Sequence, residues 1–151
     1  MVVVYRSAAR LHRTRWLFDQ AEVIAARNPN GTVVFMVVLP SADPPDKETR
    51  AENSARLKKL GDKVRRVVTV PVGDGLRVNI VRTVMRALAL IQGQAQSFCI
   101  ANTIDEGLRR LREVATAETP SRETIVADLR RLYEALGETA PLTLSERETR
   151  P

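Results

Sequence analysis

Cysteine and histidine are almost absent from this 151-residue chain, which holds one of each, Cys99 and His12. A single cysteine excludes an internal disulfide, and a structural zinc site needs about four thiolate or imidazole ligands. We therefore predict no metal site and no cofactor. A catalytic pair of Cys99 and His12 is disfavoured, because Cys99 falls in an apolar segment where cysteine usually packs as a small core residue. Scarce cysteine also favours a reducing compartment, which predicts a cytoplasmic location.

Long apolar runs and aromatic side chains are scarce as well. No segment approaches the length of about 18 apolar residues that a membrane span needs, so none is predicted. No charged segment precedes an apolar stretch at the N-terminus, as it would in a signal peptide. Aromatic residues make up 4% of the chain, so the core must be built from valine, leucine, isoleucine and alanine. The length and the 44% hydrophobic content are typical of one soluble globular domain.

Lysine is the minor basic residue, since arginine supplies 20 of the 24 basic side chains behind the net charge of +6. Guanidinium groups bind phosphate through paired hydrogen bonds, which leaves a phosphate- or nucleic-acid-binding surface open. The densest basic cluster lies beside Trp16, which could stack on bases. The alternative is a solvated helix start with Trp16 in the core, and it is favoured because the cluster holds no aromatic residue besides Trp16 and no known nucleic-acid-binding motif surrounds it. The candidate contacts to phosphate or nucleic acid are Arg10, Arg13, Arg15 and Arg77.

Short valine-rich runs alternate with helix-length segments along most of the chain. The run Val33–Leu39 is apolar at every position, which is typical of a strand that is buried on both faces of a parallel sheet. This order predicts an α/β fold with a four-stranded, mostly parallel sheet flanked by helices. The predicted strands are Val2–Tyr5, Val33–Leu39, Val67–Val72 and Phe98–Ala101, and the predicted helices span about 11–27, 47–60, 76–92 and 103–114.

An additional helix is predicted at the C-terminal end, because Thr119 and Pro120 are typical of an N-cap followed by proline in the first turn. Gly137 ends this helix, and residues 138–151 are expected to form a flexible tail. We therefore divide the chain into a domain over 1–116, an appended helix over 117–137 and the tail. The appended helix carries an apolar stripe that either docks on the chain's own sheet or binds a partner. That candidate partner-binding stripe is Ile125, Leu129, Leu132, Tyr133 and Leu136.

Two local motifs could carry chemistry, and each has a structural alternative. Gly73-Asp74-Gly75 lies between a strand and a helix, where parallel sheets bind phosphate, but a tight turn explains the glycines equally well. The carboxylates Asp43, Asp46 and Glu48 could do acid–base work, or they could cap the helix that begins at residue 47. We favour the turn and the cap. Because no complete catalytic set remains, we predict that the protein is not an enzyme.

Four local patterns carry a resemblance to a known family. They are the strand, loop and helix over Val37–Arg50, the turn Val70–Gly73, the helical segment Val81–Val84, and the short strand at Phe98 before the helix that ends near Leu111. In this order, residues 2–111 resemble the STAS-like, or SpoIIAA-like, family of small bacterial domains. The resemblance implies a non-catalytic module that regulates through protein contacts, in some members with a bound small ligand.

The chain departs from that family in two ways. The family usually has a further strand before the one predicted at Val2, so either the sheet has an open edge here or another chain supplies the strand. Regulated members also carry a serine phosphorylation site at the start of the helix after the buried strand. The corresponding segment, Pro45–Arg50, contains no serine. Phosphorylation of the family's type is therefore not expected.

From these observations we predict a non-enzymatic regulatory or scaffolding module that binds a protein partner and self-associates as a homodimer. The first alternative is a protein that binds nucleic acid or a phosphate ligand through its arginine-rich surface. A second alternative is a carrier of a small molecule or lipid, with a pocket beneath the helix that begins at Leu76.

Overall fold

The computed structural model describes residues 1–73, 75–91 and 98–139, so all but the first two residues of the tail predicted over 138–151 lie outside the described residues. The predicted α/β class is confirmed: four parallel strands form one sheet in the order β1-β2-β3-β4. In chain order the elements are β1 Val2–Tyr5, α1 Leu11–Arg27, β2 Thr32–Val38, α2 Lys47–Leu60, a 3-10 turn Gly61–Lys63, β3 Val64–Pro71, α3 Leu76–Ile91, β4 Phe98–Ile100, α4 Ile104–Arg112 and α5 Arg122–Ala135.

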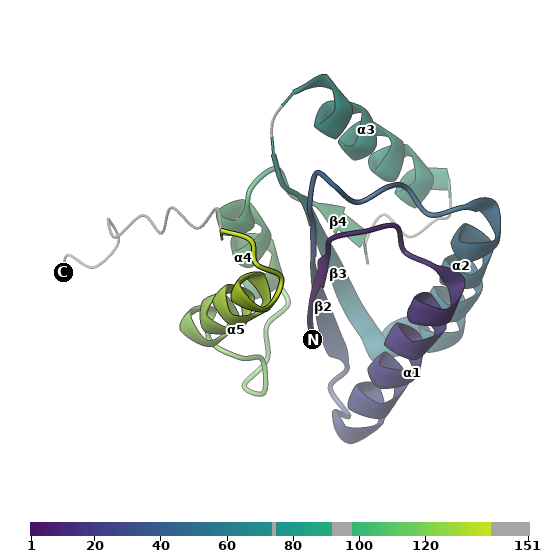
Figure 1. Cartoon of the computed structure of the whole chain (residues 1–151). Helices are drawn as coiled ribbons and strands as arrows, with labels where there is room; N and C mark the ends of the chain where they lie inside the picture. Colours follow the sequence, from purple (N-terminus) through teal and green to yellow (C-terminus); the bar gives the residue numbers. More distant parts are fainter. Residues whose placement is uncertain (74, 92–97, 140–151) are drawn as a thin grey trace.

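Helices cover the two faces of the sheet unequally (Figure 1). Helices α1 and α2 lie on one face, whereas α4 and α5 lie on the other, and α3 lies across the end of the sheet where β3 ends. Side chains alternate between the two faces along each strand. On β2, for example, Phe35 and Val37 point toward α4 and α5, while Val34 points toward α1 and α2.

The main core lies between the sheet and helices α4 and α5. Its centre contains Phe35, Val37 and Val68, which are 1% exposed or less. Leu108 and Leu111 of α4 complete the layer from outside. Gly107 lets α4 approach the sheet closely, because a Cβ at that position would lie 2.8 Å from Val70 Cγ2 and 2.9 Å from Phe35 Cε2.

The apolar stripe of α5 belongs to this core, which corrects its assignment as a partner-binding surface. Ile125, Leu129 and Tyr133 are 4%, 0% and 2% exposed and pack among the sheet side chains. Leu132 is half-buried, and the half-buried Leu136 packs against the same core. Of the two roles that the sequence left open, the structure shows intramolecular docking. Helix α4 contacts β2 and β3, and α5 covers β1 on the same face of the sheet. The apolar face of α5 is therefore buried within the chain.

The start of α5 also differs from the prediction. Ser121, not Thr119, is the N-cap, and its hydroxyl accepts a hydrogen bond from the Thr124 N–H at 3.2 Å. The Thr119 hydroxyl instead accepts from the Thr116 N–H at 2.9 Å and stabilises the preceding turn. Both residues are good caps in isolation, so only the path of the chain decides which of them meets the helix.

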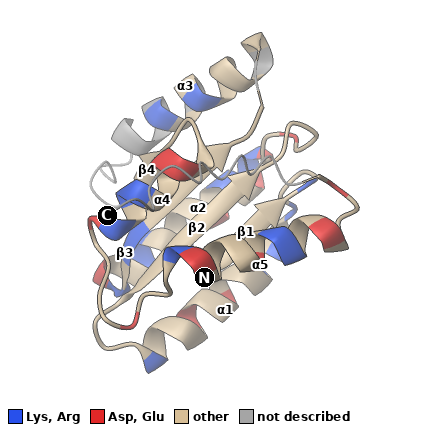
Figure 2. Cartoon of the chain, turned by 90° about the vertical axis from the view of Figure 1, so that its left-hand side faces the viewer, with Lys and Arg blue, Asp and Glu red and all other residues tan. Residues whose placement is uncertain are grey.

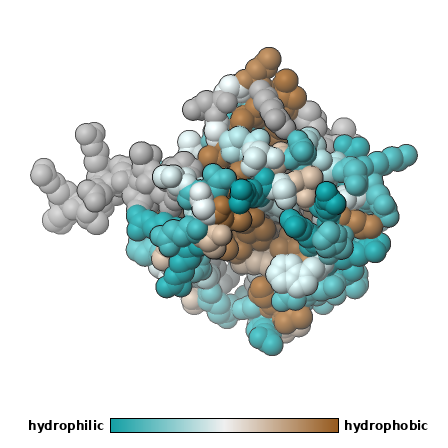
Figure 3. Space-filling model, in the orientation of Figure 1, coloured by the Kyte–Doolittle hydropathy of each residue, from teal (hydrophilic) through white to brown (hydrophobic). Residues whose placement is uncertain are grey.

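Strand β1 is an edge strand, and the described residues contain no strand beyond it. Met1 donates to the Val33 carbonyl at 2.9 Å and accepts from the Phe35 N–H at 2.8 Å, and Tyr5 accepts from the Leu39 N–H at 2.8 Å. In a parallel ladder alternate residues bond to the same neighbour. The backbone groups of Val2 and Val4 therefore point to the open side. Hydrophobic surface runs along the middle of the molecule and over α3 in the view of Figure 3, which has the orientation of Figure 1.

Candidate functional site

The candidate site lies where α3 departs from the arrangement that the strand order predicts. Right-handed crossovers between neighbouring parallel strands place all the connecting helices on one face of the sheet. Helices α1 and α2 lie together on one face, but α3 packs near the ends of β3 and β4 instead (Figure 1). Within the described ranges, no helix therefore covers part of the sheet on the α1 and α2 side.

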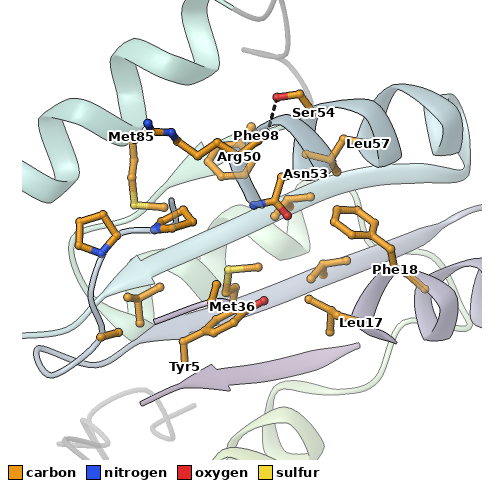
Figure 4. A pocket seen from close by; sticks show the side chains of 18 of the residues that line it. Tyr5, Leu17, Phe18, Met36, Arg50, Asn53, Ser54, Leu57, Met85 and Phe98 are labelled. Atoms are coloured by element: carbon orange, nitrogen blue, oxygen red, sulfur yellow. Dashed lines mark hydrogen bonds between the residues drawn. The ribbon is translucent and has the colours of Figure 1, made fainter. Parts of the chain in front are cut away.

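This uncovered part of the sheet forms the floor of an apolar cavity of about 310 Å³. Tyr5 of β1, Met36 of β2 and Phe98 of β4 point into it from the sheet (Figure 4). The volume lies at the lower end of the range of small-molecule sites, roughly 300–1,000 Å³. The apolar walls are contributed by Leu17 and Phe18 of α1, Leu57 of α2, and Ile80, Val81 and Met85 of α3.

Polar side chains line one side of the cavity. Arg50, Asn53 and Ser54 come from α2, and Asp43 comes from the loop before it. The Ser54 hydroxyl donates to the Arg50 carbonyl at 3.1 Å, and Asp43 is engaged in an interaction of its own. The Arg50 guanidinium, in contrast, forms no hydrogen bond or ion pair with the residues that the structure describes. The cavity is thus apolar except for a polar side on α2.

The N-cap of α2 holds this polar side in place. Asp46 Oδ1 accepts from the Thr49 N–H at 2.7 Å, and Glu48 lies in the first turn, so the predicted capping role is confirmed. The hydrogen bond from Thr49 lowers the pKa of Asp46, and the nearby Arg50 adds to the effect. A carboxylate that stays ionised in a cap is a poor proton acceptor, which argues against acid–base work by Asp46.

The two reactive side chains that the sequence singled out do not meet. Cys99 is half-buried against the α4 and α5 core, where burial raises the pKa of its thiol. His12 is exposed on α1, on the other side of the sheet. Within the described ranges, no three His, Cys, Asp or Glu side chains gather to hold a metal ion.

The predicted phosphate contacts on α1 do not form one surface. Arg10 is exposed at the N-cap, Arg13 donates to the Ser7 hydroxyl at 3.2 Å, and Arg15 pairs with Glu52 of α2 at 3.5 Å. Helix residues two positions apart point in nearly opposite directions, so Arg13 and Arg15 diverge. Trp16 is 62% exposed, contrary to the core position favoured from the sequence. It points outward because Thr14, Phe18 and Ala21 already occupy the inner face of α1.

The glycine turn before α3 gives no additional support for phosphate binding. Gly73 and Gly75 have φ values of +104° and +99°, which L residues rarely adopt, so the turn itself requires both glycines. Asp74 and the side chain of Arg77 lie outside the part of the chain that the structure describes. On α4 the acidic residues lie in the first turn and the basic residues in the last turn, whereas both signs are interspersed along α5 (Figure 2).

The residues of the cavity were largely missed by sequence reasoning. A pocket beneath the helix from Leu76 was one alternative, but Tyr5, Met36, Phe98 and Arg50 were not identified. The available signal was the uninterrupted apolar run of β2, which predicts apolar side chains on both faces of the sheet. Nothing in that run shows that one face would lack part of its helix cover.

Comparison with family models, curated proteins and solved structures finds no match for this chain. The STAS-like resemblance therefore stays a prediction. No helix of the described residues is both long and apolar enough to cross a membrane.

Proposed function

We propose that this chain is a non-enzymatic binding module that holds an apolar molecule between the sheet and helices α1, α2 and α3. The single observation that carries the proposal is the apolar cavity of about 310 Å³ over the uncovered part of the sheet. An apolar cavity excludes water at low cost and gains free energy when apolar surface fills it. A regulatory role would follow from the ligand or partner that the module holds.

Binding of the uncharged fluorophore N-phenyl-1-naphthylamine tests this proposal. We expect saturable fluorescence enhancement with the native chain. The variant Met36→Trp should lose it, because Met36 lies on the floor of the cavity and a larger ring would fill the space. The matched control is Val23→Trp, which adds the same ring at an exposed position of α1 that does not line the cavity.

The two variants separate cavity binding from adsorption to the surface. Equal fluorescence from Met36→Trp and Val23→Trp, with both variants folded by circular dichroism, would contradict the proposal. Native mass spectrometry of the purified chain supplies an independent readout, since a co-purified molecule should be present in the native chain and absent from Met36→Trp.

Self-association through strand β1 is the second candidate function. The observation that favours it is the open edge, where the backbone groups of Val2 and Val4 face away from β2. An unpaired edge strand is a template for pairing with a second chain. This candidate keeps the homodimer that the sequence predicted but moves its interface from α5 to β1.

A further inference from the structure

The polar side of the cavity narrows the chemical class of its ligand. Arg50 and Asn53 are three positions apart on α2, which places their side chains on the same side of the helix, and both line the cavity. Arg50 extends toward Met85 and Phe98, at the boundary between α2 and α3 (Figure 4). An arginine and an asparagine amide together offer several N–H donors beside an otherwise apolar space.

Arg50 is exposed and forms no ion pair with the described residues, in contrast to the cations on the side of α2 that faces α1. Arg56 lies 3.1 Å from carboxylate oxygens of Asp19, Glu22 and Glu52. Arg50 has no comparable partner among the described residues, although the carboxylate of Asp43 also lines the cavity, and Asp43 is engaged in an interaction of its own. An anion brought to the cavity would therefore meet a cation that no carboxylate of the described residues neutralises by direct contact.

We infer that the ligand is a single-chain amphiphile with an anionic head group, which rests on the proposed function of the cavity. The head group, a carboxylate or a phosphate, binds Arg50 and Asn53 at the α2 side, because guanidinium matches the geometry of both anions. The hydrocarbon chain lies over Met36 between α1 and α2. A volume of about 310 Å³ favours one chain over the two chains of a membrane phospholipid.

Isothermal titration calorimetry with decanoate and 1-decanol tests the inference, since the two probes share the hydrocarbon chain and differ in the head group. We expect the native chain to bind decanoate about tenfold more tightly or better than 1-decanol, as expected for a charge-assisted hydrogen bond. In Arg50→Gln, the affinity for decanoate should fall to that for 1-decanol, whereas the affinity for 1-decanol should stay unchanged. Arg109→Gln, an exposed change on α4 at the opposite face, is the matched control.

The outcomes separate the head-group inference from the proposed function. Equal affinities of both probes for the native chain, or an unchanged preference for decanoate in Arg50→Gln, would overturn the inference and leave the apolar cavity as a binding site. Binding of neither probe, together with no binding of N-phenyl-1-naphthylamine, would overturn the proposed function itself. Decyl phosphate distinguishes the two head groups. The anion that binds more tightly, and whose affinity depends on Arg50, identifies the head group of the natural ligand.

Discussion

At the scale of single residues, Gly107 is a position where α4 leaves no room for a side chain. An added Cβ would meet Val70 and Phe35 at distances below 3.0 Å, inside a core that is already filled. Alanine is the better helix former by about 1 kcal/mol, so propensity alone would predict a gain in stability. The close contact decides the sign of the change in stability, because overfilling a core costs more free energy than one alanine contributes to helix stability.

We expect Gly107→Ala to lower the free energy of unfolding by about 1–3 kcal/mol in urea denaturation. Arg109→Ala is the matched control, because it changes an exposed position of the same helix and should stay within about 0.5 kcal/mol of the native value. A Gly107→Ala chain as stable as the native one would show that α4 can shift away from the sheet.

The buried tyrosine of α5 provides a test in alkaline solution. The Tyr133 hydroxyl has no hydrogen-bond partner within the described ranges, and burial, helped by the Glu138 carboxylate, raises its pKa to about 12. Burial also raises the pKa of Tyr5. In the unfolded chain a tyrosine loses its proton near pH 10, whereas folded Tyr133 keeps it. The contribution of Tyr133 to stability is thus complete below pH 10 and is lost as pH rises toward about 12.

We expect Tyr133→Phe to reduce this loss of stability at alkaline pH, and Tyr5→Phe to reduce it as well. At neutral pH, Tyr133→Phe should be neutral or stabilising by about 1 kcal/mol, because it removes a buried hydroxyl without a partner. Urea denaturation across the alkaline range measures both effects, and tyrosinate absorbance of the folded chain reports the titration directly. A clear loss of stability at neutral pH would reveal a hydrogen bond of the Tyr133 hydroxyl.

At the scale of elements, Arg82 fastens α3 to the end of the sheet. Its Nη2 donates to the carbonyl oxygens of Pro71 at 3.0 Å, Gly73 at 3.2 Å and Asn102 at 3.0 Å. Its Nη1 donates to Asn79 Oδ1 within the same helix at 3.2 Å. One side chain therefore joins α3 to the last residue of β3 and to the chain segments that follow β3 and β4. The position of α3, and with it one wall of the cavity, depends on this arginine.

We expect Arg82→Gln to speed amide hydrogen exchange in α3 by about tenfold or more, because hydrogen bonds of a charged donor are lost while the main core is unchanged. Mass spectrometry of proteolytic fragments measures this helix by helix. Amides of α5 should keep their native exchange rates, and Arg130→Gln, at an exposed position of α5, should leave α3 unaffected. Unchanged exchange in α3 would mean that its apolar contacts suffice to hold it.

The sequence predicts elements better than it predicts their neighbours. The end of α1 and the start of α2 follow from local turn and cap residues, since Asn28 and Asp46 act where they stand in the chain. The predicted N-cap of α5 was wrong, because Thr119 and Ser121 offer the same local chemistry and only the path of the chain decides which of them meets the helix. Trp16 was expected in the core, yet smaller residues on the other side of α1 already fill the space against the sheet.

At the scale of the whole molecule, the parallel sheet could be predicted but the cavity could not. Apolar runs between helices determine the class of fold, because parallel strands need crossover connections. The position of α3 depends on contacts with residues outside the helix, such as those of Arg82 with Pro71 and Asn102, and no periodicity in Leu76–Ile91 records them. The same limit explains the α5 stripe, whose spacing shows an apolar face but not whether the sheet or another chain covers it.

We expect the chain to form a dimer through β1 in sedimentation velocity at high protein concentration. Val4→Pro should be monomeric, since proline removes the N–H that points to the open edge and leaves the ladder with β2 intact. Circular dichroism checks that the variant remains folded. Leu76→Glu is the control, because it charges the 77% exposed Leu76 of α3 and should leave the dimer unchanged. A native chain that stays monomeric at every concentration would contradict this candidate.

The order of the strands also determines how the nascent chain can fold on the ribosome. Each strand pairs with the one made just before it, so the sheet with α1 and α2 can assemble step by step during synthesis. The opposite face, which includes Phe35 and Val68, stays uncovered until α4 and α5 have been made. Because α5 packs against β1, the layer over β1 is completed only after α5 has left the ribosome. Until then the emerging chain presents the kind of apolar surface to which chaperones bind.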